Sequence, residues 1–207
     1  LRLVHAVKGR RNPYARPDAR TLEAKARGYP ARSVFKLEEI DRRVRLLAPG
    51  QSVLDLGAAP GSWTLYAAQK VGPRGRVLAV DISPIDQVFP DNVSVIRGDA
   101  LDLANEDLAK FAPYDVVLSD MAPNTSGTKA RDQTLSFELF MRALEVAVAL
   151  GKPGSAFVGK LFMSSDFQAA RAALKAAYQK EQTIRPSGTR SVSSEVFLVG
   201  SKLERSP

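Results

Sequence analysis

The chain has 207 residues, 44% of them hydrophobic, which is enough to bury one sizeable α/β core. It has no cysteine and one histidine, His5, which argues against disulfides, thiol catalysis and histidine-rich zinc sites, so we expect no bound metal. No apolar run reaches the ~18 residues of a membrane span and no signal peptide is visible, so we expect a cytoplasmic protein.

The positive charge is confined to the first quarter of the chain. Residues 1–50 hold 13 Lys and Arg against 5 Asp and Glu, whereas residues 51–207 hold 17 of each. A basic segment on a neutral body is typical of a protein that binds a polyanion, with nucleic acid the first candidate. We therefore expect a basic N-terminal arm and helix over 1–50, followed by a single domain over 51–207, in a monomeric protein.

The N-terminal segment predicts two helices. A short helix is expected over about 21–27, before Tyr29-Pro30 interrupts it. Ser33 is placed to cap a second helix, in which Val34, Leu37 and Ile40 follow helical spacing. That helix should end before Pro49-Gly50.

From residue 51 onward, short apolar strands alternate with helices. Strands are expected over 52–56, 76–81, 93–96, 114–119 and 155–160, with two late strands over 183–186 and 195–200. Helices are expected over 63–71, 135–150 and 167–178. This alternation predicts an α/β fold with a Rossmann-like, doubly wound, mostly parallel sheet and helices on both faces.

A loop rich in small residues follows the first strand, where open α/β sheets bind their ligands. Its small residues allow close approach to the backbone, and Asp55 disfavours a phosphate but suits a cationic ligand. Asp81 is placed to bind ribose hydroxyls, and Asp99 an adenine amino group. These demands indicate S-adenosylmethionine, which carries all these groups and no phosphate. The candidate cofactor-binding residues are Asp55, Gly57, Ala58, Pro60, Gly61, Ser62, Trp63, Asp81, Asp99 and Asp120.

Four charged residues form a second set. Asp120 ends the fourth strand, Lys160 ends the fifth, Glu195 opens the last, and Lys36 lies on the helix before the sheet. Each could be an ordinary salt-bridged residue, but a lysine inside the apolar run of strand five is rarely there for solubility.

These segments resemble the FtsJ/RrmJ family of S-adenosylmethionine-dependent RNA 2′-O-ribose methyltransferases. The resemblance runs from about residue 20 to 202, in order and with similar spacing. It rests on five segments: Phe35–Ile40, Asp55–Gly61, Ser119–Asn124, Gly159–Phe162 and Ser194–Val196. It implies the class I methyltransferase fold and a catalytic tetrad of Lys36, Asp120, Lys160 and Glu195.

The resemblance also implies that Lys160 is the proton acceptor and that the substrate is a uridine ribose of large-subunit (23S) ribosomal RNA in the 50S particle. Lys160 must be neutral to accept a proton. Burial and Lys36 favour the neutral amine, whereas Asp120 and Glu195 favour the ammonium, and the sequence leaves this balance open. Two other functions remain open, a 2′-O-methyltransferase of tRNA or another RNA and a non-catalytic RNA-binding ribosome assembly factor.

Overall fold

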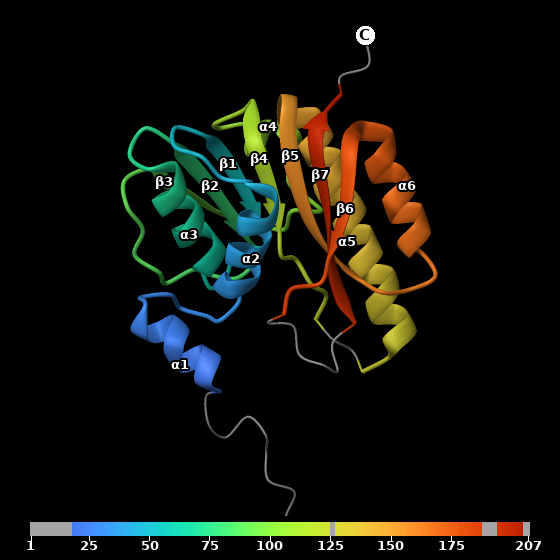
Figure 1. Cartoon of the computed structure of the whole chain (residues 1–207), viewed down its shortest axis with the longest axis horizontal. Coiled ribbons are helices and arrows are strands. Elements are labelled where there is room, and N and C mark those ends of the chain that lie inside the picture. The colour runs from blue at the N-terminus through green and yellow to red at the C-terminus, as the bar shows by residue number, and fades with distance from the viewer. Residues whose placement is uncertain (1–17, 125–126, 188–193, 205–207) are drawn as a thin grey trace, which may run out of the picture.

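The computed structural model describes residues 18–124, 127–187 and 194–204. The first 17 residues of the expected basic arm lie outside this range. A seven-stranded sheet in the order β3-β2-β1-β4-β5-β7-β6 forms the centre of the described part (Figure 1). The strands are β1 (Ser52–Leu56), β2 (Arg76–Asp81), β3 (Val93–Arg97), β4 (Tyr114–Ser119), β5 (Gly151–Phe162), β6 (Tyr178–Ile184) and β7 (Glu195–Leu203). The helices are α1 (Ala19–Ala26), α2 (Val34–Val44), α3 (Ser62–Val71), α4 (Asn105–Leu108), α5 (Lys129–Leu150) and α6 (Phe167–Ala177).

Five strands of the sheet are parallel. β1 pairs with β2 and β4, β2 pairs with β3, and β4 pairs with β5, all in parallel. β7 lies antiparallel between β5 and β6. The prediction of a doubly wound, mostly parallel sheet is therefore confirmed.

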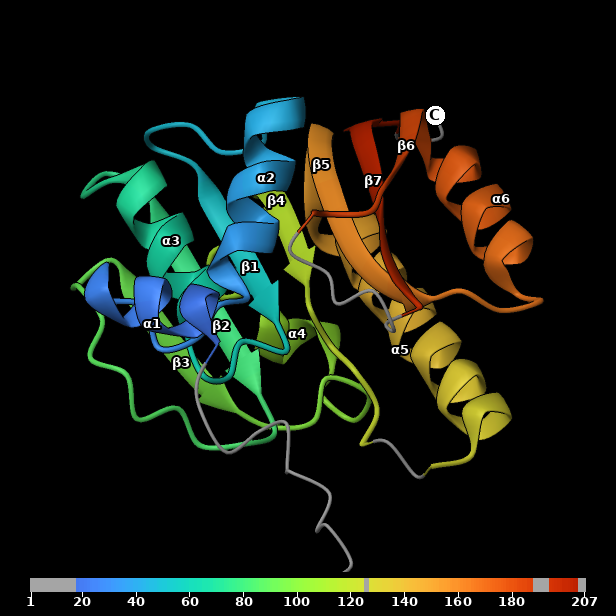
Figure 2. The same cartoon turned by 60° about the horizontal axis from the view of Figure 1, so that its bottom comes forward.

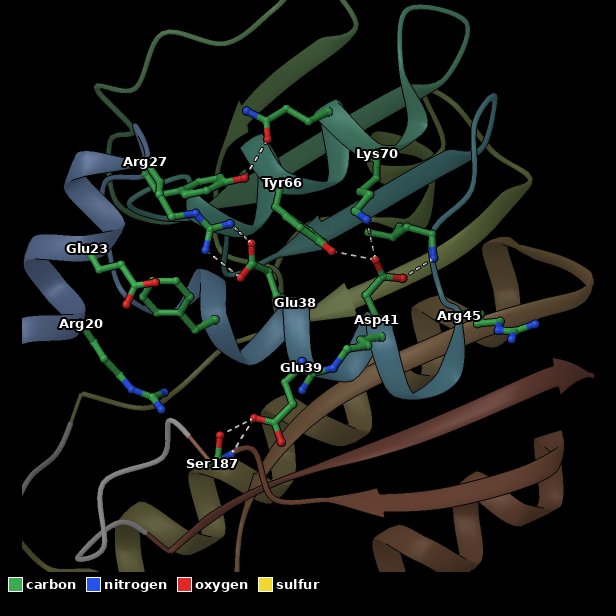
Figure 3. A pocket seen from close by; sticks show the side chains of 15 residues that line it. Arg20, Glu23, Arg27, Glu38, Glu39, Asp41, Arg45, Tyr66, Lys70 and Ser187 are labelled. Carbon is green, nitrogen blue, oxygen red and sulfur yellow. Dashed lines mark hydrogen bonds and ion pairs between the residues drawn. The ribbon is translucent and has the colours of Figure 1, made fainter.

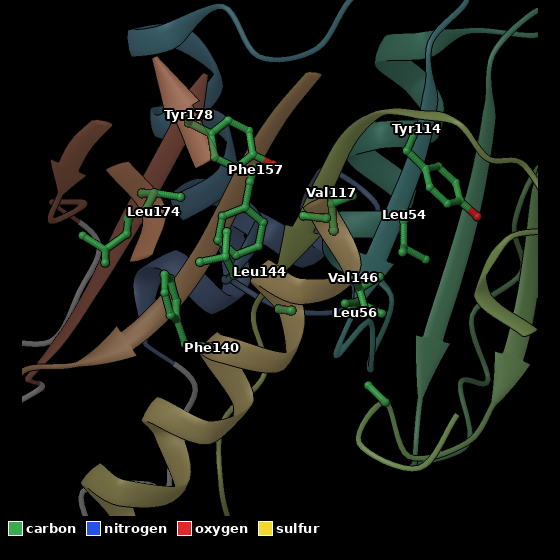
Figure 4. Close-up of a cluster of buried hydrophobic side chains, with 14 of the residues drawn as sticks. Leu54, Leu56, Tyr114, Val117, Phe140, Leu144, Val146, Phe157, Leu174 and Tyr178 are labelled. Atoms are coloured by element: carbon green, nitrogen blue, oxygen red, sulfur yellow. The ribbon is translucent and has the colours of Figure 1, made fainter. Parts of the chain in front are cut away.

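Helices cover both faces of this sheet because neighbouring residues of each strand point to opposite sides. Leu54 of β1 belongs to an apolar cluster with Phe140 of α5 and Phe157 of β5 (Figure 4). The preceding residue, Val53, belongs to a second cluster, which contains Leu37 of α2 and several residues of α3. A strand with both faces buried has consecutive apolar residues in its sequence, as β4 does.

Several boundaries differ from those predicted. α5 begins at Lys129, six residues before the predicted start, because its first turns extend beyond the sheet and lack an apolar period. β5 is longer at both ends, and β6 begins at Tyr178 immediately after α6. The short helix α4 was not predicted.

The predicted cap of α2 is wrong. Ser33 has φ −57° and ψ −23°, which are helical angles, and its side chain makes no capping hydrogen bond. A capping side chain reaches the next turn from an extended backbone, which Ser33 lacks. α1 has such a cap, since Asp18 is extended and accepts a hydrogen bond of 2.8 Å from the Thr21 backbone N–H.

Candidate active site

A cavity of about 550 Å³ opens at the carboxyl edge of β1, β2, β3 and β4. Figure 2 turns this edge of the sheet toward the viewer. Four of the predicted cofactor residues line the cavity, namely Gly57, Asp81, Asp99 and Asp120. They converge because parallel strands present their carboxyl ends at one edge, so acids that are 18 or more residues apart in the chain become neighbours.

Backbone N–H groups orient the acids that follow β2 and β3. Asp81 accepts hydrogen bonds from the N–H of Ala59 at 2.8 Å and from that of Ser83 at 2.7 Å. Asp99 accepts one from the N–H of Leu101 at 2.9 Å. The two carboxylates therefore have fixed orientations around the cavity.

Two positions of the β1–α3 loop require glycine, both because of their backbone angles and because a side chain would not fit. Gly57 has φ +78° and Gly61 has φ +107°, angles that residues with side chains rarely adopt. A Cβ atom on Gly57 would lie 2.7 Å from Cγ of Met121, and one on Gly61 would lie 2.8 Å from Cζ of Phe89. The loop therefore packs closely against the segments that follow β4 and β2.

Asp55 lies fully buried behind this loop. Its Oδ2 accepts a hydrogen bond of 2.6 Å from the Thr64 hydroxyl, while Oδ1 has no hydrogen-bond partner within the described part of the chain. Burial raises the pKa of Asp55 to about 7; the bond from Thr64 opposes this rise, and the charges of Asp120 and Asp81 add to it. An unsatisfied buried acceptor is costly, and a cationic donor at this site would satisfy it.

Like Asp55, the remaining predicted cofactor residues lie outside the cavity lining: Ala58, Pro60, Gly61, Ser62 and Trp63. The Ser62 hydroxyl exchanges hydrogen bonds with the backbone of Ala31, at 2.8 and 3.1 Å. The Trp63 indole donates to the Ser33 carbonyl at 2.9 Å and packs on Phe197. These two side chains attach α3 to the segment between α1 and α2, so only their backbone is left to meet a cofactor.

The four predicted catalytic residues form two ion pairs. Nζ of Lys160 lies 2.9 Å from Oδ1 of Asp120 and also donates a hydrogen bond to the Asp120 carbonyl. Nζ of Lys36 lies 2.5 Å from Oε1 of Glu195. Their side chains are between 7% and 17% exposed, so water screens these charges only partly.

The register of β5 and β7 brings the two pairs together. Lys160 lies directly opposite Phe197, and Glu195 lies two residues before Phe197 on the same face of the sheet. Nζ of Lys36 lies 5.8 Å from the centre of the Phe197 ring. Lys160 and Glu195 therefore lie on one face of β5 and β7, and Asp120 links this face to the cavity that it also lines.

The sequence reasoning missed several residues of the site. Ile82 and Leu101, which are 62% and 46% exposed, add apolar surface to the cavity between Asp81 and Asp99. Arg142 of α5 donates to the carbonyls of Ala100 at 3.0 Å and Leu103 at 2.7 Å, which holds the loop after β3. An apolar residue close to each acid in the sequence was a signal that could have indicated Ile82 and Leu101. The contact of Arg142 with the loop after β3 leaves no such signal in the sequence. Further lining residues are Met121, Asn124, Arg131, Leu135 and Glu138.

The sheet order, the antiparallel β7 and the acid-lined cavity define a class I, S-adenosylmethionine-dependent methyltransferase. Residues 29–203 match the model of the FtsJ-like methyltransferases, and the chain belongs to this family.

Relatives and solved structures agree with this assignment. The chain is 67% identical over 192 residues to "Ribosomal RNA large subunit methyltransferase E" of Sorangium cellulosum, which covers 93% of this chain and 91% of that protein. A crystal structure from Plasmodium falciparum, assigned as a ribosomal RNA methyltransferase, superposes with a TM-score of 0.71 at 23% identity, over 84% of this chain and 98% of that one. Fibrillarin of Aeropyrum pernix with natively bound S-adenosylmethionine superposes with a TM-score of 0.61 at 16% identity, over 81% of this chain and 76% of that one. At these identities the two structures support the fold.

None of the helices in residues 18–124, 127–187 and 194–204 has the length and hydropathy that a bilayer span requires. The same residues contain no group of three or more His, Cys, Asp or Glu side chains arranged to hold a metal ion.

Proposed function

We propose that the protein transfers a methyl group from S-adenosylmethionine to a ribose 2′-hydroxyl of large-subunit ribosomal RNA. The position of Asp120 is the observation that carries this proposal, because Asp120 both lines the cofactor cavity and pairs with Lys160. A methyl donor in the cavity and a hydroxyl beside Lys160 would then both lie next to Asp120. The curated relative with 67% identity supports the choice of substrate.

The residues of the cavity fit this cofactor. Asp81 is placed for the ribose hydroxyls, and Asp99 for the adenine amino group. Ile82 and Leu101 provide the apolar surface that an adenine ring needs. Behind the β1–α3 loop, outside the cavity lining, Oδ1 of Asp55 is a buried acceptor with no partner in the described part of the chain, and it is suited to the ammonium of the methionine part. The bound cofactor supplies an activated methyl on a sulfonium leaving group.

The tetrad would position the ribose and remove its proton. A sugar hydroxyl is a very weak acid, so a base must take its proton as the new bond forms. We assign this role to the side-chain amine of Lys160, which Asp120 holds through both its carboxylate and its carbonyl. Lys36 and Glu195, which pair beside Phe197, would orient the ribose.

The N-terminal helices would provide the grip on RNA. A cavity of about 880 Å³ lies along α1, α2 and α3 (Figure 3). Its carboxylates are largely engaged within the fold, since Glu38 pairs with Arg27 and Asp41 accepts from Tyr66 at 2.7 Å. Three arginines that line it, Arg20, Arg42 and Arg45, have no ion pair within the described residues. Arg42 also acts on Glu39 through its charge, but none of the three guanidinium groups is held in an ion pair, so each can contact a phosphate.

Replacing these three arginines with glutamine should weaken RNA binding and reduce its dependence on salt. Each lost phosphate contact reduces the magnitude of the slope of log K against log salt by about 0.7 to 0.9, so the triple variant should reduce it by about 2 to 3. Titration of labelled rRNA fragments between 50 and 300 mM salt measures this slope. Arg74→Gln is the matched control, because Arg74 lines a different cavity beside β2 and should leave the slope unchanged. Equal slopes for the wild type and the triple variant would exclude this surface.

The target is most naturally read in the assembled 50S particle, by a single copy of the chain in the cytoplasm, through shape and phosphate contacts. Incubation with methyl-labelled cofactor and 50S particles, free large-subunit rRNA or tRNA tests this directly. We expect label on one ribose of the rRNA, with a higher rate on 50S particles. Label on tRNA alone, or on a base, would refute the proposal.

A further inference from the structure

Glu39 makes a contact that the proposed mechanism does not yet use. It lies on α2, almost one turn after Lys36, and is 8% exposed. Its Oε2 accepts two hydrogen bonds from one residue, from the backbone N–H and the hydroxyl of Ser187, each at 2.8 Å. Figure 3 shows the Glu39 carboxylate pointing at Ser187, away from the rest of the cavity. Arg43 contacts the other oxygen, Oε1.

These partners keep Glu39 ionised although it is buried. Burial alone would raise the pKa of Glu39, but the two bonds from Ser187 and the charges of Arg43 and Arg42 hold it below the ordinary value. A buried carboxylate that lost such partners would be strongly destabilised. The contact between Glu39 and Ser187 is therefore a specific attachment point.

The attachment joins two segments that each carry half of a catalytic pair. Ser187 lies between the end of β6 at Ile184 and the start of β7 at Glu195. Lys36 of α2 is the ion-pair partner of Glu195. The apolar face of α2 packs on the cluster around Trp63, which sets the face of the helix that is buried. Apolar contacts are non-directional, so the hydrogen bonds to the buried Glu39 carboxylate add a directional constraint to this packing.

We propose that Glu39 is a positioning residue, and that its bonds to Ser187 hold α2 at the β6–β7 connection so that Lys36 meets Glu195 in the geometry that orients the ribose. This inference rests on the proposed function. The contact of Glu39 with Ser187 and the pair of Lys36 with Glu195 form two links between the N-terminal helices and the last hairpin. The helices that would grip RNA are thereby held in register with the catalytic residues.

Loss of this contact should reduce the rate of methyl transfer and spare cofactor affinity. A displacement of about 1 Å can reduce catalysis by about 100-fold. The lining of the cofactor cavity includes no residue of α2, β6 or β7, so the affinity for S-adenosylmethionine should not change. A general loss of folding would lower both together.

The test is a single-turnover assay on rRNA, with both cofactor and RNA saturating. We expect Ser187→Ala and Glu39→Gln each to lower the rate constant by about 5- to 30-fold, with the dissociation constant of S-adenosylmethionine within twofold of the wild type. Ser187→Thr keeps the hydroxyl and should restore most of the rate. The double variant should be little slower than the slower single variant, because both changes weaken the same contact.

Glu181→Gln is a matched control for stability. Glu181 of β6 is also mostly buried and also pairs with an arginine, Arg171, but it does not touch α2. It should lower the melting temperature without lowering the single-turnover rate. Unchanged rates in Ser187→Ala and Glu39→Gln, or cofactor affinity falling in parallel with the rate, would overturn the positioning role.

A second experiment, which does not measure activity, tests this inference separately from the proposed function. Hydrogen exchange at the Ser187 amide, followed by NMR on the whole chain, should be at least tenfold faster in Glu39→Ala, which removes the acceptor, than in the wild type. Equal exchange would show that Glu39 does not hold Ser187. If the variant showed the faster exchange but the wild-type protein methylated no rRNA, the proposed function would be refuted, whereas the attachment of Glu39 to Ser187 would stand.

Discussion

Lys160→Arg should lower the single-turnover rate of methyl transfer by about 10²- to 10⁴-fold, the range that general-base catalysis contributes. Arginine keeps the positive charge and can still pair with Asp120, but it stays protonated and cannot accept a proton. The variant therefore separates a base from a residue that acts only through its charge. The affinity for S-adenosylmethionine should stay within a few-fold, because Lys160 does not line the cofactor cavity.

Lys152→Arg is the matched control. Lys152 lies on the same strand and also pairs with an aspartate, Asp115, but it is 44% exposed and is close to the start of β5 rather than its end. Its variant should keep the wild-type rate. A Lys160→Arg protein that kept more than a tenth of the rate would rule out Lys160 as the base and assign it an electrostatic role.

Asp55→Asn should weaken S-adenosylmethionine binding by about 10- to 100-fold at pH 8, as expected for the loss of a buried, charged acceptor. In the wild type, the free Asp55 carboxyl has a pKa of about 7, and a bound ammonium favours its ionised form. Cofactor affinity should therefore rise between pH 6 and pH 8 and then level off. The variant should show no such rise. Isothermal titration across this range measures both.

The same change should stabilise the cofactor-free protein at high pH. In the unfolded chain Asp55 loses its proton near pH 4, whereas in the folded protein it keeps the proton up to about pH 7. Because the folded state holds the extra proton, this residue lowers the free energy of unfolding as pH rises from about 4 to 7, by a few kcal/mol. The melting temperature of Asp55→Asn should exceed that of the wild type by several degrees at pH 8 but not at pH 4.

Asp91→Asn controls for the general loss of a negative charge, since Asp91 is exposed and lies outside the cofactor cavity. It should change neither affinity nor the pH dependence of melting. If Asp55→Asn bound S-adenosylmethionine as tightly as the wild type at pH 8, the ammonium would have to be held elsewhere.

The sequence was sufficient for the sheet and for most of the charged residues of the site. The strand boundaries of β1, β2 and β4 match the predicted ranges, because short apolar runs between turn residues are a local signal. An acid at the end of such a strand, as at Asp81 and Asp120, has a predictable place, since all parallel strands end at one edge of the sheet. The same reasoning placed Lys160 close to this edge, although β5 continues two residues beyond it to Phe162.

The roles of loop side chains were harder to predict. Ser62 and Trp63 belong to the loop that should meet the cofactor, yet their side chains bind the segment between α1 and α2. The early start of α5 and the hold of Arg142 on the loop after β3 were also missed. For Ser62, Trp63 and Arg142 the deciding contact joins residues about 30 or more positions apart, and neither residue type nor spacing encodes it.

By itself, the sequence determined the fold class, the edge of the sheet that carries the site and the acids and lysines found there, because hydrophobic period and strand-end position are local properties. Only the tertiary structure decided which of these charges are paired. Lys160 pairs with Asp120 through the neighbouring ends of β4 and β5, and Lys36 pairs with Glu195 across 159 positions of chain. The contact of Glu39 with Ser187 is of the same kind. Such contacts depend on helix rotation and strand register, which the packing of the whole core sets.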